Sequence, residues 1–119
     1  MNKYSELIYL ASPYSKYPGG RLEAYRLACK KAGELMQDGK KIFCPIAHSH
    51  AIEVEAFNDP KDGDWWLSQD FAVLRECAAL MVYQMPGWDT SYGVQEEIKF
   101  AKWEGIPIMY IPFKEEATV

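Results

Sequence analysis

The chain has 119 residues, of which 49% are hydrophobic and 25% are charged. This length is typical of one domain, so we expect a single domain over residues 1–119 and exclude a two-domain enzyme with a cleft between its lobes. The average globular composition excludes a disordered or fibrous chain. A formal net charge of −4 argues against a nucleic-acid partner, because binding to phosphate backbones requires clustered Lys and Arg.

The sequence also bears on localisation and on metal binding. No apolar run is long enough to cross a bilayer, and the start of the chain lacks the apolar segment of a signal peptide, so we expect a cytosolic protein without membrane contact. Cys29, Cys44 and Cys77 form no CxxC pair, which indicates reduced thiols. Cys44, His48 and His50 leave a zinc site as an alternative. Because no fourth ligand has a recognisable spacing, we expect no metal and no cofactor.

Strands and helices alternate along the chain. In order, the hydrophobic pattern predicts strand 7–11, helix 21–37, strand 42–44, helix 65–76, strand 78–83, helix 92–103 and strand 106–111. The segment 51–57 fits either a short helix or an edge strand. The predicted strands are nearly continuous apolar runs, which is typical of strands covered on both faces. The alternation therefore predicts a three-layer α/β domain with a parallel sheet and right-handed crossovers.

The connections predict where a ligand binds. Those from a helix into a strand are short, whereas the segments that follow strands, 12–20, 45–63 and 84–91, are long and rich in Pro, Gly, Ser and His. In an open parallel sheet these loops gather at the carboxyl ends of the strands, where ligands bind at the topological switch point. We expect the site to be built from these three loops.

Two carboxylates occupy equivalent places in successive predicted helices. Asp70 and Glu97 each lie on the flank of the buried apolar stripe, whereas Glu96 shares the opposite face with Lys99. A boundary residue with its head group in water is the alternative for either acid. Two acids at unlike depth beside one pocket favour a division into acid and base roles.

The third predicted helix begins in a pattern that suits an anion. Ser91 or Thr90 is a good N-cap, and Gly93 allows another group to approach the backbone closely. Free amides and the positive end of the helix dipole attract anions, although most capped helices bind nothing. The first loop adds Ser12, Ser15, Lys16, Gly19, Gly20 and Arg21 before another helix. Together these groups predict a site for one phosphate.

Aromatic and histidine side chains complete the candidate pocket. Trp65, Trp66 and Trp88 fall in or beside the site loops, where they can stack on a planar base or serve as core or oligomer contacts. Exposed tryptophans on a small domain lead us to expect a homo-oligomer. His48 and His50 follow the second strand and are candidate hydrogen-bond donors or proton carriers, or simple backbone tethers.

Four motifs run in order across nearly the whole chain: IYLASP at 8–13, GGR at 19–21, QDF at 69–71 and SYGVQEE at 91–97. They resemble the nucleoside 2-deoxyribosyltransferase superfamily, which includes the 2'-deoxynucleoside 5'-phosphate N-hydrolases. CPIAHSH at 44–50 and PGW at 86–88 look closer to an uncharacterised bacterial and phage branch of that superfamily. Gln95 stands where the superfamily usually has a second glycine, so we expect a changed pocket wall.

The resemblance implies roles for individual residues. Glu97 would be the nucleophilic or cation-stabilising glutamate, Asp70 the acid that assists departure of the base, and Tyr9 a hydroxyl beside the glutamate. It implies a phosphate site at Ser91, Gly93, Arg21 and Gly20. The base and sugar pocket then comprises Ser12, Pro13, His48, His50, Trp66, Trp88 and Asp89.

The residues and the resemblance together predict a flavodoxin-like, Rossmann-like α/β domain with a four- to five-stranded parallel sheet. We expect it to take a small nucleotide or nucleoside and to cleave or exchange its N-glycosidic bond through a carboxylate nucleophile. Water as acceptor would make it a hydrolase, and a second base would make it a transferase. The alternatives are a catalytically silent nucleotide-binding or sensing module and a ribonucleotide phosphoribohydrolase.

Overall fold

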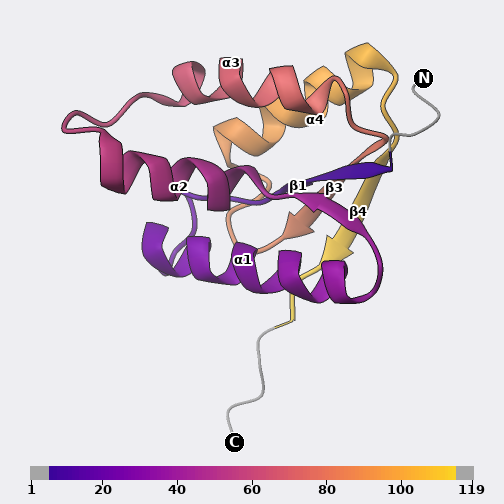
Figure 1. The fold of residues 1–119 in the computed structure, drawn as a ribbon, viewed down its shortest axis with the longest axis horizontal. Helices are drawn as coiled ribbons and strands as arrows, with labels where there is room; N and C mark the ends of the chain where they lie inside the picture. Colours follow the sequence, from indigo (N-terminus) through magenta and orange to yellow (C-terminus); the bar gives the residue numbers. More distant parts are fainter. Residues whose placement is uncertain (1–5, 115–119) are drawn as a thin grey trace, which may run out of the picture.

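The apolar runs form one parallel sheet in the order β2-β1-β3-β4 (Figure 1). The computed structural model describes residues 6–114, so residues 1–5 and 115–119 of the expected domain lie outside the described part. The strands are β1 (Leu7–Ala11), β2 (Lys41–Phe43), β3 (Ala79–Gln84) and β4 (Ile108–Pro112). β1 pairs with both β2 and β3, and β3 also pairs with β4. This order confirms the flavodoxin-like fold, with four strands in the described part of the chain.

Helices cover both faces of the sheet. They are α1 (Arg21–Gln37), α2 (Pro45–Ala56), α3 (Gly63–Leu74) and α4 (Tyr92–Glu104). Figure 1 shows α1 on one side of the sheet and α3 with α4 on the other. β1 and α1 have the predicted bounds, and the other predicted elements shift by no more than two residues. No helix within residues 6–114 has both the length and the apolar character needed to cross a membrane.

The expectation of a long loop at 45–63 was wrong, because α2 occupies most of it. Cys44 is extended, and Pro45 takes the first helical position, where its fixed φ suits a helix and its missing N–H is not needed. The ambiguous segment 51–57 is helical as far as Ala56. Pro45 is the only buried residue of this helix, so no apolar stripe marks it in the sequence.

Two apolar cores lie on opposite faces of the sheet. The core toward α3 and α4 includes Tyr9, Ala11, Leu74, Leu80, Val82, Val94, Ile98 and Ala101. The core toward α1 includes Leu10, Ala24, Ala28, Ala32, Ile42, Met81 and Tyr83. Successive residues of β1 and β3 alternate between these cores, which explains why both strands read as continuous apolar runs.

Gly87 brings two of the site loops into contact. It lies between β3 and α4 with φ of 95°, a conformation that side chains disfavour. A Cβ atom at this position would lie 2.4 Å from the carbonyl oxygen of Lys16, in the loop after β1. The two loops therefore approach each other this closely only because residue 87 has no side chain.

We expect Gly87→Ala to destabilise the protein more than Gly39→Ala. Gly39 has nearly the same φ, 93°, but nothing lies within 4 Å of a Cβ built there. Both variants carry the cost of an unfavourable φ, about 1–2 kcal/mol, and overpacking against Lys16 adds about 1–3 kcal/mol for Gly87→Ala. Urea denaturation measures the difference. Equal losses in the two variants would show that the loops separate without cost.

Candidate functional site

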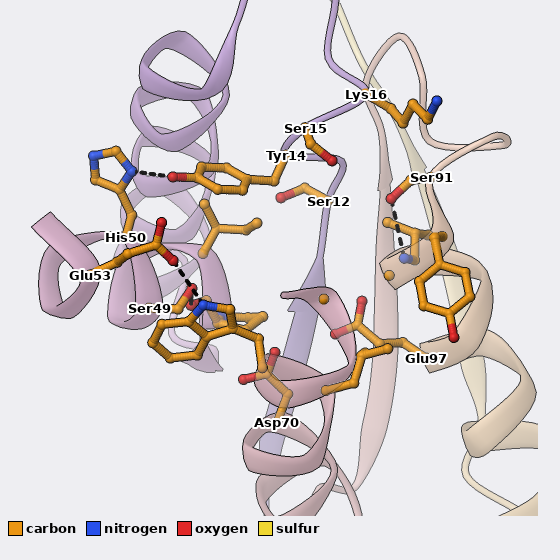
Figure 2. Close-up of a pocket in the computed structure, with 18 residues that line it drawn as sticks. Ser12, Tyr14, Ser15, Lys16, Ser49, His50, Glu53, Asp70, Ser91 and Glu97 are labelled. Carbon is orange, nitrogen blue, oxygen red and sulfur yellow. Dashed lines mark hydrogen bonds between the residues drawn. The ribbon is translucent and has the colours of Figure 1, made fainter. Parts of the chain in front are cut away.

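A cavity of about 190 Å³ lies at the carboxyl ends of the central strands. It is lined by the loop after β1, by α2 and α3, and by the start of α4 (Figure 2). β1 and β3 are neighbours whose crossovers run in opposite directions along the sheet, so the cavity lies at the topological switch point, as the sequence predicted. Its volume is below the range of about 300–1,000 Å³ that is typical of small-molecule sites.

Two of the walls are faces of helices. α2 contributes Pro45, Ile46, Ser49, His50 and Glu53, and α3 contributes Gly63, Trp66, Leu67 and Asp70. Both sets follow the three- and four-residue spacing of one helical face. Ser49 and Glu53 were not predicted as site residues, and neither were Tyr14 and Tyr92 from other elements. The spacing from Ile46 to Glu53 would have revealed the first two if 45–56 had been assigned as a helix.

All four buried polar or charged residues in the described part of the chain line this one cavity. Their exposed fractions are 4% for Ser12, 9% for Asp70, 7% for Ser91 and 5% for Glu97. Buried polar side chains are uncommon and carry a desolvation cost. The sequence had predicted each of the four as a site residue, and the structure brings them together from three separate segments.

Glu97 is held by the central strand. Tyr9, fully buried on β1, donates a hydrogen bond from its hydroxyl to Glu97 Oε2. Burial raises the pKa of Glu97 to about 8; the Tyr9 hydrogen bond lowers it in part, and the charge of Asp70 raises it further. Burial, together with the Glu97 charge, also raises the pKa of Tyr9 well above its usual value, so the phenol keeps its proton and stays a donor.

Asp70 is the second acid of the cavity. Burial raises its pKa to about 6, and interaction with the Tyr9 hydroxyl lowers it in part. Glu97 is more deeply buried and therefore holds a proton to higher pH than Asp70. Because the two groups interact, the pair shares one proton around neutral pH. The two carboxylates differ in depth. Glu96 makes a hydrogen bond to Lys99 at 3.2 Å instead of facing the cavity.

Hydroxyl groups and a lysine lie at the other end of the cavity. Figure 2 shows Ser12, Ser15, Lys16 and Ser91 there, away from Asp70 and Glu97. The Ser91 hydroxyl caps α4 by accepting from the amide of Val94 at 3.3 Å, which leaves its proton free to donate. Ser12 Oγ is buried and has no hydrogen-bond partner among residues 6–114. A buried hydroxyl without a partner, beside a helix N-terminus, suits a polar or anionic ligand.

Seven of the predicted site residues lie outside the cavity lining: Tyr9, Gly20, Arg21, Pro13, His48, Trp88 and Asp89. Tyr9 acts on the cavity through its hydrogen bond to Glu97. The guanidinium of Arg21 lies 5.4 Å from the centre of the Tyr14 ring, and Asp89 is exposed. His48 packs near Phe43, at 5.7 Å between ring centres. Trp88 turns toward Tyr110 of β4, at 5.8 Å. His50 and Trp66, in contrast, do line the cavity.

The expectation that Gln95 changes the pocket wall was wrong. Its side chain is not part of the cavity lining; it donates from Nε2 to the carbonyl oxygen of Trp88 at 3.2 Å. Gln95 therefore ties the first turn of α4 to the preceding loop.

The zinc alternative finds no support in the structure. The described residues contain no group of three or more His, Cys, Asp or Glu placed to hold a metal ion. Cys44, His48 and His50 therefore do not form a ligand set. Burial raises the pKa of the Cys44 thiol to about 11, which disfavours the thiolate that zinc requires. All three cysteines are free.

We expect Glu97→Gln to gain stability relative to the wild type as the pH rises. The folded pKa of Glu97, about 8, exceeds the value of about 4.3 for a solvated glutamate. The wild type therefore loses stability as the pH rises between these values, by up to about 1.4 kcal/mol per pH unit, and the variant lacks this loss. Urea denaturation across this range measures the difference; Glu96→Gln is the control and should differ from the wild type by a constant amount. A constant difference for Glu97→Gln as well would contradict the raised pKa.

Comparison with known proteins assigns the chain to a family whose description names no activity. No curated protein matches the chain. A family profile described as "Domain of unknown function (DUF1937)" matches residues 6–112, a range that runs from the start of β1 to the end of β4. The match includes every element that lines the cavity. The chain therefore belongs to this family, Domain of unknown function (DUF1937).

Proposed function

We propose that this domain binds a nucleoside or nucleoside 5'-monophosphate and cleaves or exchanges its N-glycosidic bond. The observation that carries the proposal is the buried Glu97 carboxyl group, bonded to Tyr9 and facing a cavity that also contains Asp70. Two carboxyl groups in one cavity, with pKa values raised to different extents, are what acid and base roles at a glycosidic bond require.

The reaction divides its steps between the two acids. Departure of the base leaves an oxocarbenium-like sugar, and the Glu97 carboxylate stabilises this cation or bonds to its C1' atom. Asp70 donates its proton to the leaving base. The developing positive charge favours ionised Glu97, so the single proton of the pair moves to Asp70 along the reaction. Tyr9 keeps Glu97 oriented. Water or a second base then takes the sugar.

A 5'-phosphate fits the hydroxyl end of the cavity. Ser12 and Ser91 donate hydrogen bonds, the start of α4 supplies free amides, and Lys16 supplies a positive charge. Lys16 thus supplies the positive charge that we expected from Arg21, because Arg21 lies outside the cavity lining. With the phosphate at this end and C1' beside Glu97, a nucleotide spans the cavity.

A binding module without turnover is the second candidate. One observation favours it: the raised pKa of Glu97 leaves this group protonated near neutral pH in the free protein, and a protonated carboxyl group is not a nucleophile. Release of free base separates the two candidates.

We expect Glu97→Gln to abolish base release and Glu96→Gln to leave the rate within a few-fold. The first variant keeps the side-chain volume and removes the charge that stabilises the sugar cation. The second changes a group that is paired with Lys99 outside the cavity. A panel of deoxyribo- and ribonucleotides and their nucleosides, analysed by chromatography, provides the measurement. Comparable rates for the two variants would remove Glu97 from the mechanism.

We expect Ser91→Ala to weaken binding of a 5'-monophosphate by about 1–3 kcal/mol and to leave nucleoside binding nearly unchanged. The nucleoside is the internal control, because loss of the helix cap would affect both ligands. Thr90→Ala, which changes the adjacent exposed hydroxyl, should affect neither. Calorimetric titration measures both affinities. Tighter binding of nucleosides than of monophosphates by the wild type would refute the phosphate site.

Association into a homo-oligomer also stays a prediction. It is supported by Trp103, which is 88% exposed on α4, and light scattering at micromolar concentration measures the mass.

A further inference from the structure

The cavity contains a third carboxylate that the proposed reaction does not use. Glu53, on α2, is half-buried and lines the cavity together with Trp66 of α3. Its Oε2 atom accepts a hydrogen bond from the indole Nε1 of Trp66 at 2.8 Å (Figure 2). This is the only hydrogen bond that the carboxylate makes to residues 6–114. The second oxygen, Oε1, is therefore available to a ligand.

Trp66 determines the orientation of the Glu53 carboxylate in the cavity. An indole N–H can only donate a hydrogen bond, so the atom that faces it must be an acceptor. The indole is itself fixed by aromatic contacts, at 4.9 Å between its centre and that of Trp65 and at 5.9 Å to that of Phe57. An ionised carboxylate has no proton to donate, so Oε1 also offers the cavity only an acceptor.

The place of Glu53 in the cavity relates it to one part of the substrate. This step rests on the proposed function, which puts the phosphate beside Ser12 and Ser91 and the C1' atom beside Glu97. The base then occupies the remaining space between α2 and α3, whose walls include Ser49, Glu53 and Trp66. A flat base in this space can turn its polar edge toward Oε1 of Glu53.

We propose that Glu53 selects nucleotides whose base carries an exocyclic amino group. An amino group donates a hydrogen bond to Oε1, whereas an oxo group at the same place is a second acceptor and is repelled. Cytosine and uracil differ at one such position, and so do adenine and hypoxanthine. A site discriminates against a ligand that leaves one of its polar groups without a hydrogen-bond partner.

The test compares the affinities of these matched pairs. Calorimetric titration of the Glu97→Gln variant, in which no ligand is consumed, uses the 2'-deoxynucleoside 5'-monophosphates of the four bases. We expect the cytosine and adenine nucleotides to bind about tenfold or more tightly than their uracil and hypoxanthine counterparts, as for hydrogen bonds to charged groups. Equal affinities within both pairs, tighter binding of the oxo members, or no binding of any of the four would overturn the proposal.

Glu53→Gln, made in the same background, should reverse the preference. The Trp66 indole requires the amide oxygen as its acceptor, which turns the amide NH₂ group toward the cavity and the oxo bases. Glu55→Gln, on the exposed face of the same helix, is the matched control and should keep the original preference. If Glu53→Gln instead lowers the affinity for both nucleotides of each pair equally, Glu53 has a structural role only.

Trp66→Phe tests the orienting role of the indole by a second route. It keeps an aromatic ring against Trp65 and Phe57 but removes the N–H donor. In this variant the preference for amino bases should fall several-fold, because Glu53 is no longer held, and adding Glu53→Gln should produce no reversal. An unchanged preference in Trp66→Phe would overturn the positioning role, even if Glu53→Gln did not fold.

The outcome for Glu53 is separate from that for the proposed reaction. Selective binding of amino bases by a protein that releases no base would refute the glycosidic reaction and support the inference about Glu53. Base release without selectivity in either pair would support the reaction and refute the inference.

Discussion

The hydrogen bond from Tyr9 to Glu97 connects the centre of the sheet to the second turn of α4, and the site is arranged around it. Both groups are buried, so each depends on the other for a partner that water would otherwise supply. Tyr9 lies on β1, one of the two inner strands of the sheet, which pairs with β2 on one side and with β3 on the other. A carboxyl group held by such a strand is positioned by the whole sheet.

Burial sets the electrostatics of the cavity more than any charge does. Desolvation is the largest cause of the raised pKa of both Glu97 and Asp70. No Lys or Arg is bonded to either acid in the described part of the chain, so the pair is stabilised by protonation and by the Tyr9 hydroxyl. A ligand that brings positive charge to this end, such as a sugar cation, supplies the missing counter-charge.

The helices and loops around this pair divide the cavity by chemistry. The serines and Lys16 lie at one end, and the two acids lie at the other. α2 and α3 add a wall with aromatic and acceptor groups, joined by the bond between Glu53 and Trp66. Gly87 allows the loops after β1 and β3 to approach each other closely, so the hydroxyl end depends on a position where no side chain fits.

The sequence by itself determined the α/β architecture and the four polar residues of the cavity. Continuous apolar runs and helical periodicity are local patterns, so β1, α1 and the order of strands along the chain could be predicted from them. Asp70 and Glu97 were found because each lies on the flank of a buried helical stripe, and Ser12 and Ser91 because each follows a strand or starts a helix. These signals depend on neighbours a few residues away.

Only the tertiary structure decided which side chains of α2, α3 and the loops face the cavity. α2 was missed because much of its inner face meets the cavity and only its first turn packs against the core, which leaves no apolar stripe in the sequence. Trp88 and Arg21 lie near the site in sequence but turn toward Tyr110 and Tyr14. Glu53 and Trp66 are 13 positions apart and meet only because α2 and α3 pack across the cavity. Side-chain directions of this kind follow from long-range packing, which no local pattern encodes.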